Sequence, residues 1–266
     1  RYALAATSVG NYALFGGGYS KEVYETPRVD AYNKSLTRST PTALSSARND
    51  LVATSVGNYA LFGGGRTDVS SYSVRVDAYN TSLTRTTATA LSEARYALAA
   101  TSVGNYALFG GGRDMASDFA VVDAYNTSLT RSTPTALSQA RCYLVATSVG
   151  NYALFGGGDA ASYSKVVDAY NTSLTRSTPT SLSKARQSLV ATSVGDYALF
   201  GGGGSGSSSY LDVVDAYDTS LTRSTPTPLS VARRYFAATS VGNYALFGGG
   251  RPSSSSVSSV VDAYTA

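Results

Sequence analysis

The eleven residues SVGNYALFGGG at 8–18 decide the fold, because they return five more times along the 266-residue chain. Four of the later copies are identical and lie at 55–65, 102–112, 148–158 and 240–250, and the copy at 193–203 carries Asp196 in place of Asn. The string VDAY follows the copies at 29–32, 76–79, 122–125, 167–170, 214–217 and 261–264. Successive triple glycines stand 45 to 47 residues apart, a period typical of a propeller blade or a solenoid unit.

Each repeat contains four short runs that are typical of β-strands. In the first copy these runs are LAATSV at 4–9, YALFG at 12–16, VDAYN at 29–33 and LTRSTPTAL at 36–44, called here the first to fourth strands of a unit. They are rich in Val, Tyr, Thr and Phe and are separated by Gly, Asn and Pro, which favour turns. No stretch shows the 3.6-residue apolar period of a helix.

A lone four-stranded sheet cannot bury both of its faces, whereas six such sheets packed radially can. Small residues in the first strand suit the crowded centre of such an arrangement, and Tyr12, Leu14 and Phe15 on the second strand can fill the wider space between sheets. The sequence therefore predicts an all-β fold, a six-bladed β-propeller with four-stranded antiparallel blades, forming one domain over 1–266. The expected repeats span approximately 1–47, 48–94, 95–140, 141–185, 186–232 and 233–266.

The fourth-strand segment occurs only five times, at 33–48, 80–95, 126–141, 171–186 and 218–233. We therefore expect the last blade to lack its outer strand. The strand around 260–264 would then offer unpaired N–H and C=O groups to an added strand.

Paired glycines after an apolar strand, followed by a Val-x-x-Tyr strand, resemble the kelch repeat. The resemblance recurs six times and covers nearly the whole chain. One departure is that kelch repeats usually carry a tryptophan shortly after the tyrosine, whereas this chain has none and places NTSLTR at 80–85, with Leu83 and Arg85, in the equivalent stretch. The resemblance implies a protein-interaction module, although some kelch-like proteins are sugar-oxidising enzymes.

The six copies differ at two places. One is the connection between the second and third strands, at 19–28, 66–75, 113–121, 159–166, 204–213 and 251–260. The other is a dyad before the first strand, at 2–3, 49–50, 96–97, 142–143, 187–188 and 234–235. Because neighbouring strands are antiparallel, these two connections share one end of a sheet. The variation is thus predicted at one end of every blade.

Nine of the 21 tyrosines fall in these variable segments, and the other twelve belong to the repeated strings. Tyr together with Ser, Gly and Asn is typical of adaptable binding loops. We therefore expect a non-catalytic binding or recognition module for a protein or carbohydrate ligand; the simpler interpretation is that loops tolerate change. The candidate ligand-binding residues are Tyr2, Tyr19, Asp50, Arg66, Tyr96, Arg113, Tyr143, Arg234, Tyr235 and Arg251.

An arginine precedes the dyad in every repeat, at Arg1, Arg48, Arg95, Arg141, Arg186 and Arg233. A ring of guanidinium groups could bind a carboxylate, a sulfate or a sialylated ligand. The structural interpretation is that each arginine clamps a local carboxylate or carbonyl, and an identical residue in every copy favours it. The aspartates of VDAY are likewise expected to make a turn bond or to pair with the fourth-strand arginines, the Arg38 series, rather than to hold a metal.

Several functions are disfavoured by composition. The chain has no histidine, so a Ser or Cys nucleophile lacks its usual base. The copper site of kelch-like sugar oxidases also needs histidine, and Cys142 with Tyr143 supplies only half of it. We expect no enzyme, no cofactor and no metal.

The net charge of +4 comes from the repeated framework, in which the arginines outnumber the VDAY aspartates by five. The other positions hold ten basic and eleven acidic residues, so no nucleic-acid surface is expected. No apolar run is long enough for membrane insertion. The pattern leans weakly towards an extracellular or virion surface protein. Two other interpretations stay open: a synthetic or rebuilt near-symmetric propeller without a ligand, and a structural assembly block.

Overall fold

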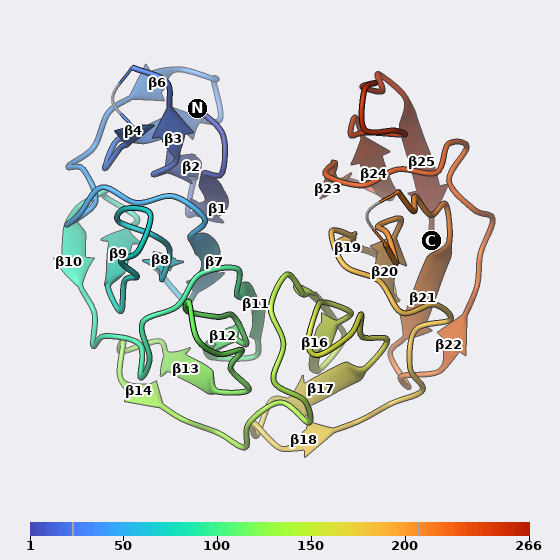
Figure 1. Cartoon of the computed structure of the whole chain (residues 1–266). Coiled ribbons are helices and arrows are strands. Elements are labelled where there is room, and N and C mark those ends of the chain that lie inside the picture. The colour runs from blue at the N-terminus through green and yellow to red at the C-terminus, as the bar shows by residue number, and fades with distance from the viewer. Residues whose placement is uncertain (23, 207) are drawn as a thin grey trace. The chain divides into compact units, whose positions relative to one another are not determined.

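The computed structural model describes residues 1–22, 24–206 and 208–266. The regular secondary structure within these residues consists of β-strands. Six antiparallel sheets follow one another along the chain, five with four strands and the last with three (Figure 1). The fold is the expected six-bladed β-propeller whose last blade lacks its outer strand. The chain forms two compact units, residues 1–136 and 137–266, each with three blades.

The first unit holds blades 1 to 3. Blade 1 consists of β1 (Ala5–Val9), β2 (Tyr12–Gly16), β5 (Val29–Asn33) and β6 (Arg38–Ser39). Blade 2 consists of β7 (Val52–Val56), β8 (Tyr59–Gly63), β9 (Val76–Asn80) and β10 (Arg85–Thr87). Blade 3 consists of β11 (Ala99–Val103), β12 (Tyr106–Gly110), β13 (Val122–Asn126) and β14 (Arg131–Ser132). A two-stranded sheet, β3 (Tyr19–Ser20) and β4 (Tyr24–Glu25), lies in the variable loop of blade 1.

The second unit holds blades 4 to 6. Blade 4 consists of β15 (Val145–Val149), β16 (Tyr152–Gly156), β17 (Val167–Asn171) and β18 (Arg176–Ser177). Blade 5 consists of β19 (Val190–Val194), β20 (Tyr197–Gly201), β21 (Val214–Asp218) and β22 (Arg223–Ser224). Blade 6 consists of β23 (Ala237–Val241), β24 (Tyr244–Gly248) and β25 (Val261–Thr265).

Adjacent blades in each unit meet along their first strands. In the first unit β7 contacts both β1 and β11, and in the second unit β19 contacts both β15 and β23. The small residues of these strands permit this close approach, as the sequence predicted. The first glycine of the triple in blade 1 is also a packing residue: a Cβ added to Gly16 would lie 2.7 Å from a ring carbon of Phe62 in the next blade. Gly18 has φ +103°, a conformation that favours glycine.

The segment that leaves one blade is also fastened to the next. The hydroxyl of Tyr79 in blade 2 donates to the carbonyl of Thr42 in blade 1 at 2.7 Å, and its ring packs edge-on against Phe62 at 5.9 Å. Leu83, which stands where kelch repeats usually have a tryptophan, packs against the same core. The outer part of blade 2 is therefore filled by a tyrosine and a leucine.

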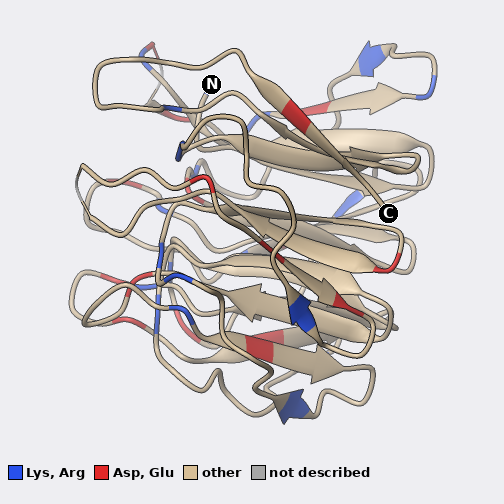
Figure 2. Ribbon diagram, turned by 90° about the vertical axis from the view of Figure 1, so that its right-hand side faces the viewer, with Lys and Arg blue, Asp and Glu red and all other residues tan. Residues whose placement is uncertain are grey.

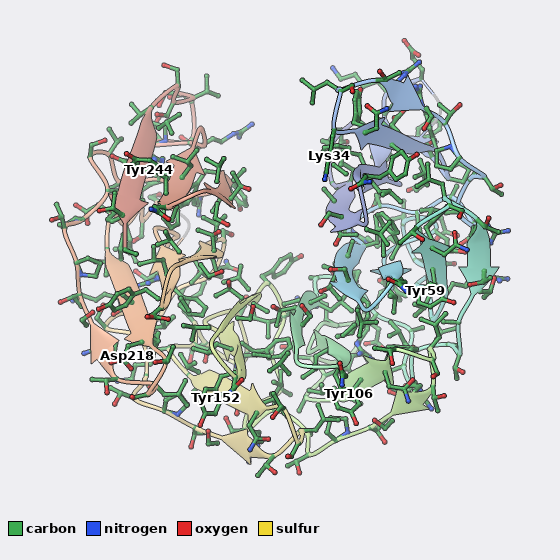
Figure 3. All side chains as sticks on the ribbon, turned by 180° about the vertical axis from the view of Figure 1, so that it is seen from behind. Lys34, Tyr59, Tyr106, Tyr152, Asp218 and Tyr244 are labelled. Atoms are coloured by element: carbon green, nitrogen blue, oxygen red, sulfur yellow. The ribbon has the colours of Figure 1, made fainter. Side chains whose placement is uncertain are left out.

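The end of each blade opposite the variable loops carries nearly constant turns, and Tyr59 and Tyr106 mark it in the first unit (Figure 3). In the turn after β9, the side-chain oxygen of Asn80 accepts hydrogen bonds from the amides of Ser82 at 3.0 Å and Thr84 at 2.9 Å. Asn80 belongs to the repeated Asn-x-Ser sequence, so the asparagine of this sequence is a turn-capping residue.

Candidate functional site

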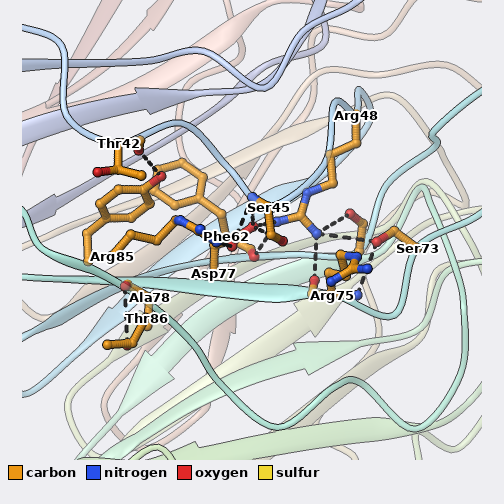
Figure 4. Close-up of polar contacts among 12 residues, drawn as sticks. Thr42, Ser45, Arg48, Phe62, Ser73, Arg75, Asp77, Ala78, Arg85 and Thr86 are labelled. Carbon is orange, nitrogen blue, oxygen red and sulfur yellow. Dashed lines mark hydrogen bonds and ion pairs between the residues drawn. The ribbon is translucent and has the colours of Figure 1, made fainter.

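The repeated arginine lies inside its blade in a buried charge network (Figure 4). Both Arg48 and Asp77 have fully buried side chains, and the Arg48 guanidinium donates to the carboxylate of Asp77 and to the carbonyl of Phe62. The Asp77 carboxylate also accepts from Arg85 at 2.8 Å and from the amide and hydroxyl of Ser45, at 3.1 Å each. Every oxygen of Asp77 is thus satisfied by framework residues.

The network recurs in the following blades. The ion pairs are Arg95–Asp123 and Arg141–Asp168 at 2.8 Å, Arg186–Asp215 at 2.9 Å and Arg233–Asp262 at 2.6 Å, each with a fully buried arginine. Burial lowers the pKa of Arg48 to about 10, with the Asp77 charge acting against the shift. Arg48 therefore remains a cation at neutral pH.

Five of the six arginines considered as a ligand-binding ring therefore have buried side chains that are paired with an aspartate. Arg1 pairs with Asp30, and its side chain is 17% exposed. This geometry matches the structural-clamp interpretation, and the pairing of the VDAY aspartates with fourth-strand arginines is confirmed. Lys and Arg elsewhere are interspersed with Asp and Glu along the ribbon (Figure 2).

The two variable segments of each blade are joined by the backbone. The first dyad residue and the first loop residue form an antiparallel bridge in every blade. The bridged pairs are Tyr2–Tyr19, Asn49–Arg66, Tyr96–Arg113, Cys142–Asp159, Gln187–Gly204 and Arg234–Arg251. The prediction that both segments lie at one end of a blade is therefore confirmed. In each blade one residue of the dyad pairs with one residue of the loop through the backbone.

The second dyad residue has a positive φ in all six blades, although none is glycine. These residues are Ala3 (53°), Asp50 (50°), Ala97 (52°), Tyr143 (50°), Ser188 (54°) and Tyr235 (57°). The amide of Asp50 donates to the carbonyl of Ala3 at 3.0 Å, and that of Tyr235 to Ser188 at 3.4 Å, so the dyads of neighbouring blades are connected. Sequence reasoning missed this conformation because no Gly or Asn recurs there.

Blades 1 and 2 enclose a hollow of about 320 Å³ at their variable ends. Four candidate residues line it, namely Tyr2, Tyr19, Asp50 and Arg66, together with Ala3, Glu25, Asn49, Asp68 and Val69. Tyr2 is 60% exposed, and its ring lies 5.1 Å from that of Tyr19. The fold thus gathers candidates that are up to 64 residues apart in sequence.

Arg66 lines the hollow and packs on aromatic rings. Its guanidinium lies 4.4 Å from the centre of the Tyr96 ring and 5.9 Å from that of Tyr72, and these two rings stack at 5.1 Å. It also donates to the carbonyl of Val69 at 3.2 Å and lies 4.0 Å from Asp50. Tyr96 is buried beneath this arginine, so it supports Arg66 rather than facing solvent.

The remaining candidates lie in separate places. Arg113 pairs with Asp118 at 3.6 Å within its own loop. In the second unit, Arg234 stacks on Tyr210 at 4.8 Å and on Tyr235 at 5.1 Å.

Tyr235 and Tyr143 are exposed, Arg251 is bridged to Arg234, and Cys142 is buried. Within the described residues, no three His, Cys, Asp or Glu side chains group as metal ligands. No helix in that part of the chain could span a membrane.

No known protein family and no curated protein matches this chain.

Proposed function

We propose that the protein is a non-catalytic recognition module of kelch type whose variable blade ends bind a protein or carbohydrate ligand. The observation that carries the proposal is the pairing of both variable segments at one end of each blade, where tyrosines line an open hollow between blades 1 and 2. The kelch assignment is carried by the recurring glycines and the Val-x-x-Tyr strand.

The difference between the bonded framework side chains and the exposed side chains of the variable segments supports this proposal. In blade 2 the framework arginine, aspartate and tyrosine, which are Arg48, Asp77 and Tyr79, are bonded to one another or to backbone carbonyls. The variable side chains Tyr2, Tyr143 and Tyr235 are at least 42% exposed. Exposed tyrosines on a rigid backbone offer large contact areas at a low entropy cost.

The test is a protein and glycan array followed by alanine substitution. We compare three variable-end substitutions with one control, Tyr197→Ala. The three are Tyr2→Ala, Tyr143→Ala and Tyr235→Ala, and Tyr197 is 40% exposed at the constant end. An aromatic hot spot costs about 2 kcal/mol on truncation, a roughly thirtyfold loss of affinity. Binding that depends on Tyr197 and on none of the other three would refute a variable-end site and favour an assembly role for the constant end.

We also propose that the protein is catalytically silent toward esters, glycosides and sugar alcohols. The sequence offers no histidine as a base, and its single cysteine, Cys142, is buried. Metal-dependent turnover that copurifies with the protein through repeated chromatography would contradict this proposal. A complete absence of binding on the arrays would instead support a ligand-free propeller.

A further inference from the structure

The hollow between blades 1 and 2 has an acidic lining. Three carboxylates, those of Glu25, Asp50 and Asp68, face one guanidinium, that of Arg66. Hydrogen bonds from Ser70, above all from its amide, lower the pKa of Asp68, which keeps this carboxylate charged. Burial raises the pKa of Asp50, and Arg66 only partly opposes the shift. The lining therefore has an excess of two negative charges when all four groups are ionised.

Arg66 also gives the Asp50 carboxylate no hydrogen bond, because its guanidinium contacts other groups. Its guanidinium lies over the Tyr96 ring and donates to the carbonyl of Val69. Its distance to Asp50 is 4.0 Å, longer than a hydrogen bond. The two groups attract each other, but the Asp50 carboxylate receives no hydrogen bond from Arg66.

Asn49 adds a second, independent feature. Its side chain is buried, with 9% of the residue exposed, and it also lines the hollow. Its amide nitrogen donates to the Glu25 carboxylate at 3.3 Å, which fixes which end of the carboxamide is the oxygen. That oxygen is buried and has no donor among the described residues. A buried acceptor without a donor costs free energy, which a donor from a ligand would recover.

Tyr2 and Tyr19 supply the third feature. Their rings lie 5.1 Å apart at 45°, and Tyr2 presents a largely exposed surface. The faces of aromatic rings attract cations. Carboxylates, a carboxamide oxygen and tyrosine rings are all groups that recognise a cation bearing N–H donors.

We propose that this hollow binds the primary ammonium group of an alkylamine, as found in a lysine side chain of a partner protein or in a free polyamine. The proposal rests on the recognition function proposed above and specifies the ligand chemistry of one site. An ammonium group has three donors, one for the Asn49 oxygen and the others for Asp50 and Glu25. The alkyl chain behind it packs against Tyr2 and Tyr19.

The test uses the ¹⁵N-labelled full chain and the probe Nα-acetyl-lysine methylamide. We expect saturable shifts of the Asn49 side-chain amide and of the Asp50 and Arg66 backbone amides, with an affinity that falls as salt is raised. Nα-acetyl-norleucine methylamide, which lacks the ammonium group, should give no such shifts. The trimethyllysine analogue keeps the charge but lacks N–H donors, and should bind about tenfold more weakly if the Asn49 oxygen takes a donor.

Matched variants connect these shifts to the residues. Asp50→Asn should weaken lysine binding about tenfold, and asparagine tolerates the positive φ of this position. The control is Ser188→Asn, the equivalent dyad position of blade 5, which should leave binding unchanged. Spermidine and a lysine-containing peptide distinguish the two sources of the ammonium group by their relative affinities.

Equal binding of the lysine and norleucine probes, or full binding by Asp50→Asn, would overturn the ammonium proposal. A neutral glycan that shifts these resonances while the lysine probe does not would also overturn it, but would leave the recognition function standing. If no probe, peptide or glycan shifts any variable-end resonance, the recognition function fails as well.

Discussion

The amide of Asn49 donates to the carbonyl of Arg66 at 3.0 Å, and the amide of Arg66 donates back to the carbonyl of Asn49 at 2.8 Å. This pair of backbone bonds fixes the two variable segments of blade 2 without involving either side chain. The same bridge holds Tyr96 to Arg113 in blade 3, where the residue types differ. The bridge therefore explains how side chains can change between repeats while the backbone that presents them stays the same.

The residue after this bridge carries a backbone strain that one substitution can relieve. Ala97 has φ +52°, where an L-residue with a Cβ is disfavoured by about 1–2 kcal/mol. Ala97→Gly should raise the free energy of unfolding by about 1 kcal/mol, because the relieved strain exceeds the added flexibility of the unfolded chain. Urea denaturation measures the change.

The control for Ala97→Gly is Ala100→Gly within β11, which should destabilise the protein by about 0.5–1 kcal/mol. A destabilisation of similar size by both substitutions would show that position 97 is not strained.

The buried charge network predicts an unequal response to one substitution made in two blades. Asp77→Asn leaves Arg48 fully buried with its charge uncompensated, and should lower the free energy of unfolding by about 3–5 kcal/mol. Asp30→Asn should cost less, because the side chains of its partners Arg1, Arg28 and Arg38 are 17%, 49% and 52% exposed. Chemical denaturation of both variants checks the difference. Equal losses would mean that burial of the arginine does not govern the energy of the pair.

The repeat alone was enough to predict the first three strands of each blade, the six blades and the short last blade. The fourth strand is shorter than predicted, since the run expected over 36–44 forms a strand only at Arg38–Ser39. An 11-residue string with a fixed period leaves little freedom in the register of a four-stranded sheet. The clamp role of Arg48 and Asp77 was also accessible, since an identical residue in every copy indicates a packing requirement. Antiparallel strand geometry was enough to place both variable segments at the same end of each blade.

The details of the site were not accessible from the sequence, for physical reasons. The positive φ of Asp50 accompanies a backbone hydrogen bond to Ala3 of the neighbouring blade, and it recurs in six copies whose residue types differ. Tyr96 is in a variable segment yet is buried, because Arg66 from another blade covers it. The unpartnered oxygen of Asn49 depends on the placement of Glu25, 24 residues earlier. All three features arise from contacts between blades.

The buried tyrosines predict a loss of stability in alkali. Burial, followed by the charge of Asp123, raises the pKa of Tyr125 well above the ordinary value of 10.0. In the unfolded chain its hydroxyl ionises near pH 10. Its contribution to stability is therefore fully present below pH 10 and is lost as the pH rises towards the folded-state pKa. The loss amounts to about 1.4 kcal/mol per pH unit above 10.

Tyr125→Phe should abolish this part of the pH dependence. At neutral pH it should cost about 1 kcal/mol, because the hydroxyl donates to the carbonyl of Thr89 at 2.7 Å. Above pH 10 the parent protein's advantage in the free energy of unfolding should shrink, and at higher pH the variant should become the more stable of the two. Comparing the two proteins by denaturation at each pH separates the tyrosine from the buried arginines. The exposed Tyr235→Phe serves as the control, and parallel curves for Tyr125→Phe and the parent would contradict the prediction.

The last blade predicts that a fourth strand can be added. In blade 5, β22 pairs with β21 at Ala216–Ser224 and Tyr217–Arg223, and Asp215 forms ion pairs with Arg186 and Arg223. In blade 6, β25 is the outer strand of its sheet, and the ion pair of Asp262 among the described residues is with Arg233. Val261 on this strand is 61% exposed. The free edge of β25 can therefore pair with an added strand. The Asp262 carboxylate can accept a second arginine carried by that strand.

Replacing Thr265–Ala266 by NTSLTRSTPTALSQA continues the chain in the register of the other blades. If its arginine reaches Asp262 and its backbone pairs with β25, the added strand should contribute about 1 kcal/mol, which raises the melting temperature by about 2–4 °C for a protein of this size. The matched control carries Gln in place of that arginine and should recover only part of the increase, because the ladder forms without the ion pair. Hydrogen exchange at Ala263 and Tyr264 reports the pairing directly and should slow in the extended protein. If melting and exchange are both unchanged by the extension, β25 does not act as an open edge, and strand addition at 260–264 by a partner protein is excluded for the same reason.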